Sequence, residues 1–543
     1  MTATPRPQSV RAISLQSVAE CAGVSQTPHE VIDSRLVVTG VTHDSRAVRP
    51  GDLYAALPGA NVHGARFVGP AVGLGAVAVL TDPEGAASLA PEGIAVPVLV
   101  VPEPRAVLGD VAALIYGRAS QRLTMLGITG TNGKTTTAYL LDSALQALGA
   151  VTGLIGTVET RIGADTIKSV RTTPESADLH ALFAVMLERG VDTCTMEVSS
   201  HALALHRVDG VRFDVVAFTN LSQDHLDFHG SMEDYFLAKA SLFTPQRAAR
   251  AVVCVDDEWG RRLVRESRVP VTTISSRPDV LADWQIRTTG SHESAFDLVA
   301  GGRRLSLRSA LAGDFNRVNT GVAALVLLAA GYPVDAIEVA LAVEPHVPGR
   351  MEAVLVDGLD PAQGPERSGM PLAVVDFAHT PDAVAAALKA MRQSTSGSLI
   401  VVLGAGGDRD AGKRPAMGAA AAAYADTVIV TDDNPRSEDP AAIRAAVLGG
   451  ATGEQASAAS RGRSAVTVRE IGERGAAIRE AVAGAGAGDT VVILGKGHES
   501  GQETAGVVHP FDDRAQLRAA LSERTASRQQ PAPVDRSASG EQQ

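Results

Sequence analysis

The sequence predicts an α/β protein of three domains, and three observations point to this. The chain has 543 residues, of which 45% are hydrophobic and 20% charged. At roughly 100–200 residues per domain, this length corresponds to three or four domains. The apolar runs are continuous rather than alternating and are separated by helical stretches, which is typical of parallel strands buried on both faces. The composition excludes a disordered or collagenous chain.

The first predicted domain, residues 12–121, is a small α/β domain. Short apolar runs between Gly and Pro turns predict strands at residues 36–41, 52–57, 76–81 and 97–101. A helical stretch covers residues 105–116. The polar segment 117–122 precedes a new apolar run, so the first boundary is placed there.

The second predicted domain, residues 122–345, and the third, residues 346–523, each alternate strands with helices, as a wound parallel sheet requires. The second domain has predicted strands at 123–129, 193–198, 215–220 and 251–255. The Rossmann-like third domain has them at 372–377, 398–404, 427–431 and 490–494. Residues 344–349 form a predicted hinge. Residues 524–543 carry almost no apolar side chains, which predicts a disordered tail.

Charge and cysteine content narrow the functional classes. The formal net charge of −12 disfavours a general nucleic-acid binder, which needs a basic surface. Three scattered cysteines are too few for a disulfide framework or a zinc cluster. The N-terminal residues lack a signal-peptide core, and the apolar segment 321–343 is broken by Gly331-Tyr332-Pro333, which favours two helices and a turn over a membrane span. These features predict a cytoplasmic protein without membrane insertion, and a monomer by default.

The strongest motif is Gly130-Thr131-Asn132-Gly133-Lys134-Thr135-Thr136-Thr137, which follows a predicted strand and opens a helical stretch. A glycine-rich turn at a helix N-terminus presents backbone N–H groups to phosphates. Lys134 is expected to reach the β and γ phosphates, and the Thr135 hydroxyl to ligate Mg²⁺. The ordinary P-loop pattern has a further Gly where Ile128 stands, so this is a compact variant; a chance glycine turn is the alternative.

Polar residues follow two further strands of the second domain. Glu197 ends a predicted strand, where a carboxylate faces the ligand crevice of a parallel sheet and can hold Mg²⁺. A lone Glu at such a position is more often a solvated or capping residue. The segment Asp224-His225-Leu226-Asp227-Phe228-His229 suits a metal or phosphate site and suits a hydrogen-bonded loop equally well.

These segments occur in the order of the Mur ligases, together with Gly313-Asp314-Phe315-Asn316, Asn319 and Asp376-Phe377-Ala378-His379-Thr380-Pro381. The chain resembles the MurE-type branch of this family, which adds the third peptide residue to UDP-N-acetylmuramoyl-L-alanyl-D-glutamate. The resemblance covers about residues 12–523. It implies an ADP-forming, ATP-dependent acid–amino-acid ligase of cytoplasmic peptidoglycan precursor synthesis, and hence a role in cell-wall biogenesis, cell shape and cell division.

For the reaction centre, the resemblance implies roles for Lys134, Lys239 and His225 as catalytic residues. Lys239 would be carbamylated, because a CO₂ adduct converts an ammonium into a carboxylate that binds a hard cation. Taken alone, Lys239 would be a surface lysine of a helix. His225 would share the second magnesium with this carbamate, so the implied metal ligands are Thr135, Glu197, His225 and Lys239.

The resemblance also implies the nucleotide contacts, in the phosphate loop and at four positions beyond it. Arg350 would bring positive charge to the phosphates, and Asp376 would contact the ribose. Asn316 and Asn319, taken alone, suit a cap or a turn equally well. The implied ATP-binding residues are Gly130, Thr131, Asn132, Gly133, Lys134, Thr135, Thr136, Asn316, Asn319, Arg350 and Asp376.

The UDP-muramoyl dipeptide would be bound by residues of the first two domains. Thr172-Thr173-Pro174 resembles the family segment that contacts this substrate, and Ser199 and Arg207 fall at similar positions, Arg207 pairing with a substrate carboxylate. Ser45, in His43-Asp44-Ser45-Arg46, resembles a contact of the uridine nucleotide. Some relatives carry Gln where Leu205 stands, which removes one polar contact.

The third domain would select the amino acid. Three segments of this domain each follow a predicted strand, and they are therefore expected to converge at one edge of the sheet. They are residues 406–410, 433–436 and 495–499. Asp-Asn-Pro-Arg at 433–436 is also a Pro turn, and it is the form that the diaminopimelate-adding enzymes use. Arg436 would bind the extra carboxylate of diaminopimelate, Arg409 would add a second cation, and Glu499 would bind the distal ammonium. The implied contacts are Arg409, Asp433, Asn434, Pro435, Arg436, Gly495 and Glu499.

The predicted activity is therefore a two-step amide ligation through an acyl phosphate, with ATP as co-substrate, Mg²⁺ as cofactor and small molecules as partners. A folylpolyglutamate-synthase-like ligase shares the last two domains, and the segments at 43–46 and 433–436 argue against it. A non-catalytic nucleotide-binding scaffold and a P-loop motor are further alternatives. The set Lys134, Thr135, Glu197, His225 and Lys239 disfavours the scaffold, and Ile128 and the lack of basic patches disfavour the motor.

Overall fold

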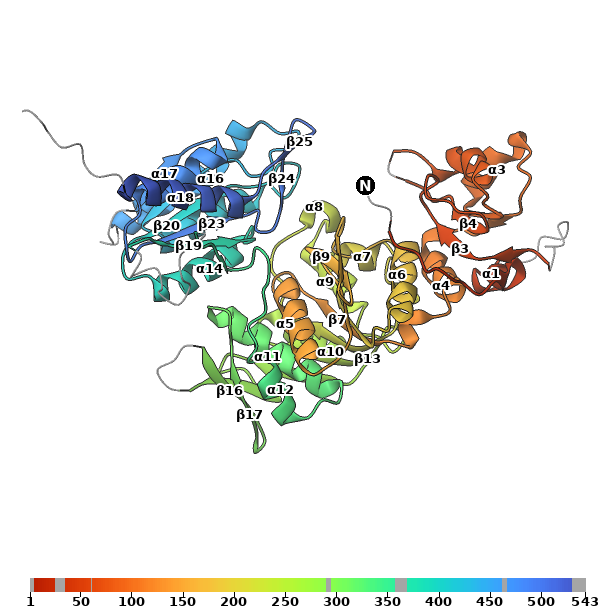
Figure 1. Cartoon of the computed structure of the whole chain (residues 1–543), viewed down its shortest axis with the longest axis horizontal. Helices are drawn as coiled ribbons and strands as arrows, with labels where there is room; N and C mark the ends of the chain where they lie inside the picture. Colours follow the sequence, from red (N-terminus) through yellow and green to blue (C-terminus); the bar gives the residue numbers. More distant parts are fainter. Residues whose placement is uncertain are drawn as a thin grey trace, which may run out of the picture. The chain divides into compact units, whose positions relative to one another are not determined.

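The computed structural model describes residues 4–24, 35–59, 61–289, 294–356, 369–460 and 466–529. The chain forms two compact units (Figure 1). The first unit comprises Met1–Leu221, Phe228–Ala310 and Asn316–Pro345, and the second comprises Ser222–Asp227, Leu311–Phe315 and His346–Gln543. The short segments 222–227 and 311–315 thus group with the C-terminal part of the chain.

The first unit begins with a small α/β fold. Its four-stranded sheet is parallel, in the order β3-β4-β5-β6, with β3 at Gly40–Thr42, β4 at Asp52–Ala55, β5 at Ala78–Thr81 and β6 at Val98–Val100. The predicted strand at 36–41 is two strands, because β2 (Val37–Val38) pairs with β1 (Ile13–Ser14) whereas β3 pairs with β4. The helical segments are α1 (Leu15–Cys21), η1 (Gly64–Phe67), α2 (Val68–Gly73), α3 (Pro83–Leu89), η2 (Ala90–Glu92), α4 (Pro104–Ile115) and η3 (Ala119–Gln121).

An eleven-stranded sheet forms the rest of the first unit, in the order β10-β9-β8-β11-β7-β12-β13-β14-β15-β16-β17. Its middle, from β8 to β15, is parallel, and the strands outside it pair antiparallel. The central strands are β8 (Thr152–Ile155), β11 (Thr193–Glu197), β7 (Thr124–Thr129), β12 (Phe213–Phe218), β13 (Ala248–Cys254), β14 (Val271–Ser275) and β15 (Trp284–Thr288). The outer strands are β9 (Glu159–Ile162), β10 (Asp165–Lys168), β16 (Ala295–Ala300) and β17 (Arg303–Arg308).

Helices pack against this sheet through the continuously apolar strands. One core joins Met125, Met196 and Phe218 of three adjacent strands to Leu179 and Phe183 of a helix, all buried. The helices are α5 (Lys134–Ala147), α6 (Ser176–Glu188), α7 (Ser200–Ala204), α8 (Leu226–His229), α9 (Met232–Ala240), α10 (Glu258–Glu266), α11 (Asp314–Ala329) and α12 (Val334–Ala340). The two helices and turn predicted for 321–343 are confirmed as α11 and α12. Across the described residues, no helix combines the length and apolarity that crossing a membrane requires.

The second unit contains a six-stranded sheet in the order β18-β19-β23-β20-β21-β22, parallel except for β18. Alternate residues of its strands point to opposite faces. Val401 and Val492 pack toward one core, and Val402 and Ile493 toward the other, so both faces are covered by helices. The strands are β18 (Glu352–Ala353), β19 (Leu372–Asp376), β20 (Leu399–Leu403), β21 (Thr427–Val430), β22 (Thr467–Glu470) and β23 (Thr490–Leu494).

The helices of the second unit are α14 (Pro381–Ser394), α15 (Lys413–Tyr424), α16 (Pro440–Ser460), α17 (Arg474–Gly484) and α18 (Asp513–Gln529), and a hairpin is formed by β24 (Gly501–Thr504) and β25 (Val507–Pro510). Helix α18 extends into the predicted tail, so residues 524–526 are helical and anchored. Arg524 donates to the carbonyls of Val482 and Ala483, and the Thr525 hydroxyl lies 3.0 Å from the Leu521 carbonyl. Residues 530–543 lie outside the described residues.

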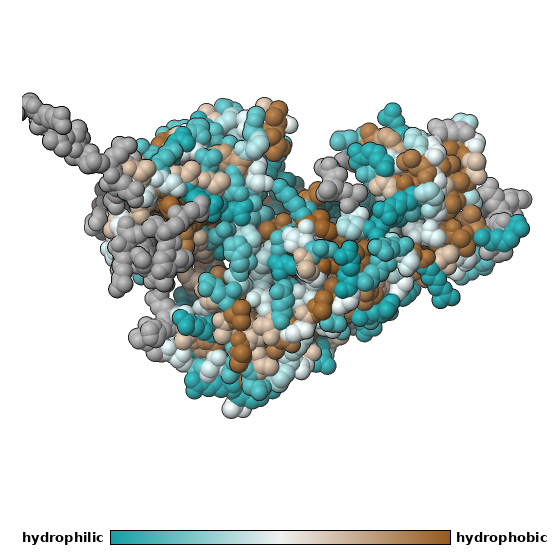
Figure 2. All heavy atoms as spheres, viewed as in Figure 1, coloured by the Kyte–Doolittle hydropathy of each residue, from teal (hydrophilic) through white to brown (hydrophobic). Residues whose placement is uncertain are grey.

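The predicted α/β class with parallel sheets is confirmed. On the visible surface of each unit, hydrophobic areas are interspersed with hydrophilic ones (Figure 2). The exposed large apolar side chains include Phe67, Leu74, Leu281 and Val339, which come from different elements.

A buried histidine of the first unit makes folding sensitive to acid. His180 of α6 is fully buried, and its Nε2 donates to the Asp209 carbonyl at 2.9 Å. Burial lowers the pKa of His180 to about 4. The unfolded chain therefore takes up a proton on this residue near pH 6.5, whereas the folded chain does so only near pH 4. Stability from His180 is present above pH 6.5 and is lost as the pH falls toward 4.

We expect the variant His180→Gln, which keeps a donor for the Asp209 carbonyl but does not titrate, to flatten this dependence. Between neutral pH and the pKa of His180 in the folded protein, the wild-type free energy of unfolding should fall by on the order of 3 kcal/mol because of this residue, and the variant should not show this fall. Urea unfolding of both proteins across this interval measures it. A parallel decline of stability in wild type and variant would contradict the prediction.

Candidate functional site

The phosphate loop lies where three adjacent parallel strands end. It connects β7 to α5, between β11 and β12 in the sheet. Gly130 has a φ of +147°, and a Cβ there would lie 2.0 Å from Thr219 Oγ1, so only glycine fits. The loop is fastened to the end of β12, because Asn220 accepts from the Asn132 N–H at 2.9 Å and Thr219 Oγ1 donates to the Asn132 carbonyl at 2.6 Å. This is the strand, turn and helix N-terminus that phosphates require.

The functional side chains of the loop are held by hydrogen bonds. Lys134 Nζ donates to the carbonyls of Gly130 and Thr131 at 3.0 and 2.9 Å. The Thr135 hydroxyl donates to Glu197 Oε2 at 2.9 Å. Thr135 and Glu197 are both buried, and Thr136 is buried beside them in the first turn of α5. The loop hydroxyl and the strand-end carboxylate predicted from the sequence are therefore in direct contact, whereas the loop lysine folds back onto carbonyls of the loop itself.

Lys239 is a buried residue, although the sequence alone would place it on the surface of a helix. Its side chain projects from α9, and Nζ donates to the Gly130 carbonyl at 2.8 Å. The Tyr235 ring lies 4.7 Å from the same Nζ, and the Tyr235 hydroxyl lies 3.1 Å from Thr131 Oγ1. Tyr235 was missed by the sequence reasoning, because its only signal is the i, i+4 spacing to Lys239 on one helix face.

Asn316 and Asn319 lie on the first turns of α11, against the phosphate loop. The Asn319 amide nitrogen donates to Asn316 Oδ1 at 3.1 Å. A Cβ on Gly133 would lie 2.5 Å from Asn319 Oδ1, so this amide touches the loop itself. Both residues are buried, and Asn319 lies against the last glycine of the loop.

The residues predicted for the dipeptide substrate form a second cluster of the first unit. The Thr173 hydroxyl donates to the Glu197 carbonyl at 2.9 Å and accepts from the Ser199 N–H at 3.1 Å. The Thr172 hydroxyl lies 3.0 Å from that of Thr157, which in turn donates to Glu197 at 3.1 Å. Arg207 donates to the Thr173 carbonyl at 3.4 Å. Thr172, Thr173, Ser199 and Arg207 thus adjoin the buried carboxylate behind the phosphate loop.

Glu175 organises the arginines of this cluster. Its carboxylate pairs with Arg207 at 2.9 Å, with Arg105 at 2.9 Å and with Arg171 at 3.1 Å. Burial alone would raise the pKa of Glu175, but Arg207 and Arg105 outweigh it and the pKa is lowered. Three cations around one carboxylate leave an excess of positive charge, which suits an anionic ligand. Sequence reasoning missed Glu175, Arg105 and Arg171; the only signal was the position of Glu175 directly after Thr-Thr-Pro.

Ser45 lies in the turn that follows β3, at the carboxyl edge of the small parallel sheet. Its neighbour Asp44 accepts from Arg46, which lowers the pKa of Asp44. Ser45 therefore lies in a loop at a strand end, which is a common place for residues that bind a ligand.

In the second unit, Asp224 is a buried carboxylate held by three basic side chains. Lys413 Nζ lies 3.1 Å from Oδ1, His225 Nε2 3.3 Å from Oδ2, and His379 Nε2 3.7 Å from Oδ2. Burial alone would raise the pKa of Asp224, but His379, His225 and Lys413 hold it far below its usual range. His225 has a φ of +55°, so the loop turns sharply at this residue. Lys413 and His379 are partners that the sequence reasoning did not assign.

Asp376 and Arg350 also lie in the second unit. Asp376 ends β19 and accepts from the N–H groups of Met351 and Ala378, each at 2.8 Å. Burial raises the pKa of Asp376, and Arg350 opposes this. The Arg350 guanidinium lies 4.3 Å from the centre of the Phe377 ring.

The three segments predicted to converge do so beyond β20, β21 and β23. The Asn434 carbonyl accepts from the Gly407 N–H at 2.9 Å, and the Asn434 amide donates to Glu499 Oε2 at 2.8 Å. Gly495 has a φ of +118°, and a Cβ there would lie 2.6 Å from Asp433 Oδ2, so only glycine allows this approach. Pro435 packs against Gly407 in the same way, because a Cβ on Gly407 would lie 1.9 Å from the Pro435 carbonyl oxygen.

Arg436 Nη1 donates to the Gly407 carbonyl at 2.5 Å, and Nε lies 3.6 Å from Glu503. Its backbone joins the hairpin, because its N–H donates to the Glu503 carbonyl at 2.9 Å. Arg409 is about half exposed and lies 3.8 Å from Asp227. The two predicted carboxylate-binding arginines thus flank the same loops. Glu503 was missed, because its hairpin carries no motif.

The site offers few side chains that could bind a metal ion, and those that could do so are oxygen donors. Among the described residues, no group of three or more His, Cys, Asp or Glu side chains is arranged to hold a metal ion. The Thr135 hydroxyl and the Glu197 carboxylate are both hard oxygen donors, buried and 2.9 Å apart, and they fit Mg²⁺, which is usually bound by one or two protein ligands plus phosphates.

A parallel sheet whose central strand ends in a phosphate loop, backed by a buried Thr–Glu pair, defines the class of P-loop-like nucleotide-binding α/β proteins. Three family models match the chain: "Mur ligase family, catalytic domain" at residues 37–116, "Mur ligase middle domain" at 128–327, and "Mur ligase, glutamate ligase domain" at 365–497. Together they span most of the described chain.

Two curated relatives and one solved structure carry the same name. The UDP-N-acetylmuramoyl-L-alanyl-D-glutamate--2,6-diaminopimelate ligase of Streptomyces avermitilis is 54% identical over 96% of this chain and 98% of that protein. The ligase of the same name from Corynebacterium glutamicum is 46% identical over 91% and 94%. A solved structure of a ligase with this name has a TM-score of 0.62 and 30% identity, covering 95% of this chain and 99% of that one. The chain belongs to the Mur ligase family.

The predicted resemblance and fold class are therefore confirmed, and the chain is a ligase of this family. Folylpolyglutamate synthase of Mycobacterium tuberculosis, solved with ADP and AMPPCP, has a TM-score of 0.54 at 19% identity, covering 71% of this chain and 91% of that one, which shows a shared fold.

Proposed function

We propose that this ligase joins diaminopimelate to UDP-N-acetylmuramoyl-L-alanyl-D-glutamate at the expense of ATP, in cytoplasmic peptidoglycan precursor synthesis. The observation that carries the proposal is the convergence of Arg436, Asn434 and Glu499 beyond three parallel strands, together with a complete phosphate loop in the first unit. Relatives that are 54% and 46% identical bear the name of this reaction.

The nucleotide site is assigned to the phosphate loop. Backbone N–H groups of 130–136 and Lys134 surround the phosphates, and Asn316 and Asn319 contact the nucleotide from α11. Thr135 and Glu197 would hold Mg²⁺. The family resemblance assigns ligands of a second ion to Lys239, as a carbamate, and to His225. Bound Mg²⁺ neutralises charge on the transferring phosphoryl group. The family resemblance assigns a phosphate contact to Arg350 and a ribose contact to Asp376, both of the second unit.

The dipeptide substrate is assigned to the cluster around Thr172, Thr173, Ser199 and Arg207, with Ser45 at the uridine end. Arg207 is pre-oriented by Glu175, so its guanidinium meets a substrate carboxylate without first ordering its own side chain. The cluster adjoins Glu197, so the D-glutamyl carboxylate is delivered beside the phosphate loop.

The proposed chemistry is an amide ligation in two steps. A D-glutamyl carboxylate oxygen attacks the γ-phosphorus, and the bond to ADP breaks, while Lys134 neutralises negative charge on the phosphoryl oxygens. The amine of diaminopimelate then attacks the acyl carbon, loses a proton, and expels inorganic phosphate as the amide forms. The protein positions charged reactants and excludes water from the acyl phosphate.

An isotope experiment tests this proposal. The substrate is prepared with ¹⁸O in both oxygens of the reacting carboxylate and incubated with ATP, Mg²⁺ and diaminopimelate. We expect one ¹⁸O in the inorganic phosphate and one in the new amide, both detected by mass spectrometry. Amide without label in the phosphate would contradict the acyl phosphate, and the absence of diaminopimelate-dependent product would contradict the proposed activity.

A further inference from the structure

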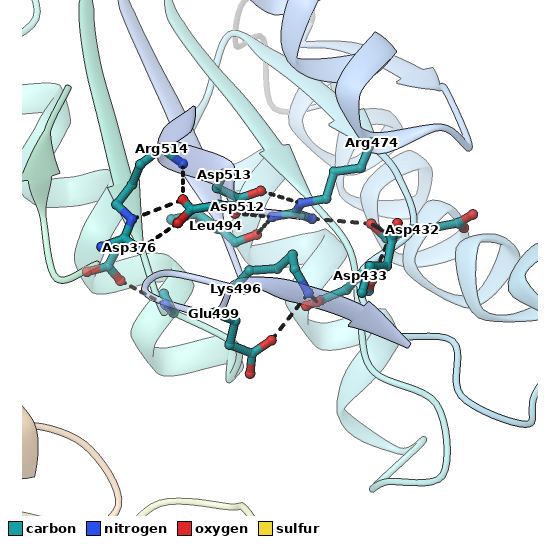
Figure 3. Close-up of polar contacts among 12 residues, drawn as sticks. Asp376, Asp432, Asp433, Arg474, Leu494, Lys496, Glu499, Asp512, Asp513 and Arg514 are labelled. Atoms are coloured by element: carbon teal, nitrogen blue, oxygen red, sulfur yellow. Dashed lines mark hydrogen bonds and ion pairs between the residues drawn. The ribbon is translucent and has the colours of Figure 1, made fainter. Parts of the chain in front are cut away.

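The diaminopimelate cluster contains a lysine that the proposed function does not use. Lys496 lies between Gly495 and the loop that carries Glu499, and its side chain is fully buried (Figure 3). Nζ donates to Asn434 Oδ1 at 3.0 Å and to Glu499 Oε2 at 3.3 Å, and it lies 3.6 Å from Asp433 Oδ1. A buried ammonium with three oxygen partners is costly to place and has no path to solvent.

These contacts fix the orientation of the Asn434 amide. Its Oδ1 accepts from Lys496 Nζ and from the Glu503 N–H at 3.0 Å, so both lone pairs are occupied. Its Nδ2 donates one hydrogen to Glu499 Oε2 at 2.8 Å. One Asn434 N–H therefore remains for a carboxylate acceptor.

The same contacts decide which Glu499 oxygen meets a ligand. Oε2 receives both Lys496 and Asn434, whereas within the described part of the chain no group donates to Oε1. The Glu499 side chain is 35% exposed, so it is accessible to a ligand from solvent. A carboxylate held by one oxygen presents the other in a single direction, which an exposed glutamate otherwise loses to rotamer freedom.

We propose that Lys496 is a positioning residue that sets the selectivity for the distal ammonium of diaminopimelate, by holding Glu499 and Asn434 in one arrangement. This inference rests on the proposed function of the site. Lys496 itself does not touch the ligand. Without it, Asp433 is a buried carboxylate lacking its lysine partner, and Glu499 is free to turn to solvent.

The probe is 2-aminopimelate, which keeps both carboxylates and the attacking amine of diaminopimelate but lacks the distal amine. We expect the wild-type protein to prefer diaminopimelate over 2-aminopimelate in kcat/KM by about 10- to 100-fold, the range of one hydrogen bond to a charged group. In Lys496→Met this preference falls to near unity, through a higher KM for diaminopimelate, while the KM values for ATP and the UDP-linked substrate stay within about twofold.

A double-mutant cycle separates positioning from general destabilisation. In the Glu499→Gln background, Lys496→Met causes no further loss of preference, because both act through one contact. Lys389→Met, which removes an exposed lysine of α14, is the matched control and keeps the full preference. If Lys496→Met does not fold, Lys496→Gln carries the same test with an intermediate loss.

The outcomes are distinct. One outcome is that the wild-type protein uses diaminopimelate and Lys496→Met still prefers diaminopimelate over 2-aminopimelate. This overturns the role of Lys496 and leaves the proposed function intact. An equal loss with diaminopimelate and 2-aminopimelate also overturns it, because it indicates a structural role alone. Wild type that does not use diaminopimelate overturns the proposed function itself.

Discussion

Replacing Lys134 by Ala is expected to reduce ligation by at least about 10³-fold, because the loop loses the cation that neutralises the transferring phosphoryl group. In the structure, Lys134 Nζ donates to the carbonyls of Gly130 and Thr131, within the loop that is proposed to bind the phosphates. The variant should lose activity through a lower kcat, since charge on the phosphoryl oxygens is largest in the transition state. Phosphate release under saturating substrates measures it.

The control for this variant is Lys168→Ala, which removes an exposed lysine at the end of β10. Its activity should equal that of wild type. Near-normal ligation by Lys134→Ala, with an unchanged thermal unfolding midpoint, would contradict the assignment of residues 130–137 as the phosphate loop of this ligase.

The largest effect on stability is expected from Asp513→Ala in the second unit. Arg474 and Asp513 are both fully buried and form a two-pronged ion pair, Nε to Oδ1 and Nη2 to Oδ2, each at 2.7 Å (Figure 3). Arg474 also donates to the carbonyls of Leu494 at 2.9 Å and Asp432 at 3.3 Å, so it ties together the ends of β23 and β21. Removing the carboxylate leaves a buried, unpaired guanidinium, which costs about 3–5 kcal/mol.

Urea unfolding of the full chain measures this loss. The matched control is the double variant Arg474→Met with Asp513→Leu, which replaces both charges by apolar side chains and is expected to recover most of the stability. A single variant as stable as wild type would show that the pair is not the anchor of these strand ends.

The sequence reasoning worked best where chemistry follows regular structure. The phosphate loop, Glu197 and the three segments of the second unit were located because parallel strands end at one edge of a sheet. The buried position of Lys239 could not be obtained from its own segment, since burial depends on α9 packing against the loop after β7. Only the family resemblance pointed to it.

The sequence did not reveal the residues that hold other side chains in position through ion pairs. Glu175 meets Arg105 across seventy positions of the sequence, and Lys413 meets Asp224 across a still longer interval. Neither pair leaves a periodic or local signal, because an ion pair needs proximity in space and not a spacing along the chain. The same holds for Lys496, whose neighbours come from 433–434 and 499.

The domain boundaries at 121 and 345 and the roles of the individual site residues remain predictions. Within the chain, the small sheet and the eleven-stranded sheet belong to one unit, and His346 begins the main segment of the other.

This Mur ligase is expected to select diaminopimelate, and an assay of phosphate release tests that selectivity most directly. The protein is supplied with ATP, Mg²⁺ and UDP-N-acetylmuramoyl-L-alanyl-D-glutamate, and with meso-diaminopimelate, LL-diaminopimelate or lysine in parallel reactions. We predict phosphate release with at least one diaminopimelate isomer and none above background with lysine, since only diaminopimelate offers a carboxylate to Arg436 and an ammonium to Glu499. Release with lysine alone, or with none of the three, would contradict the account.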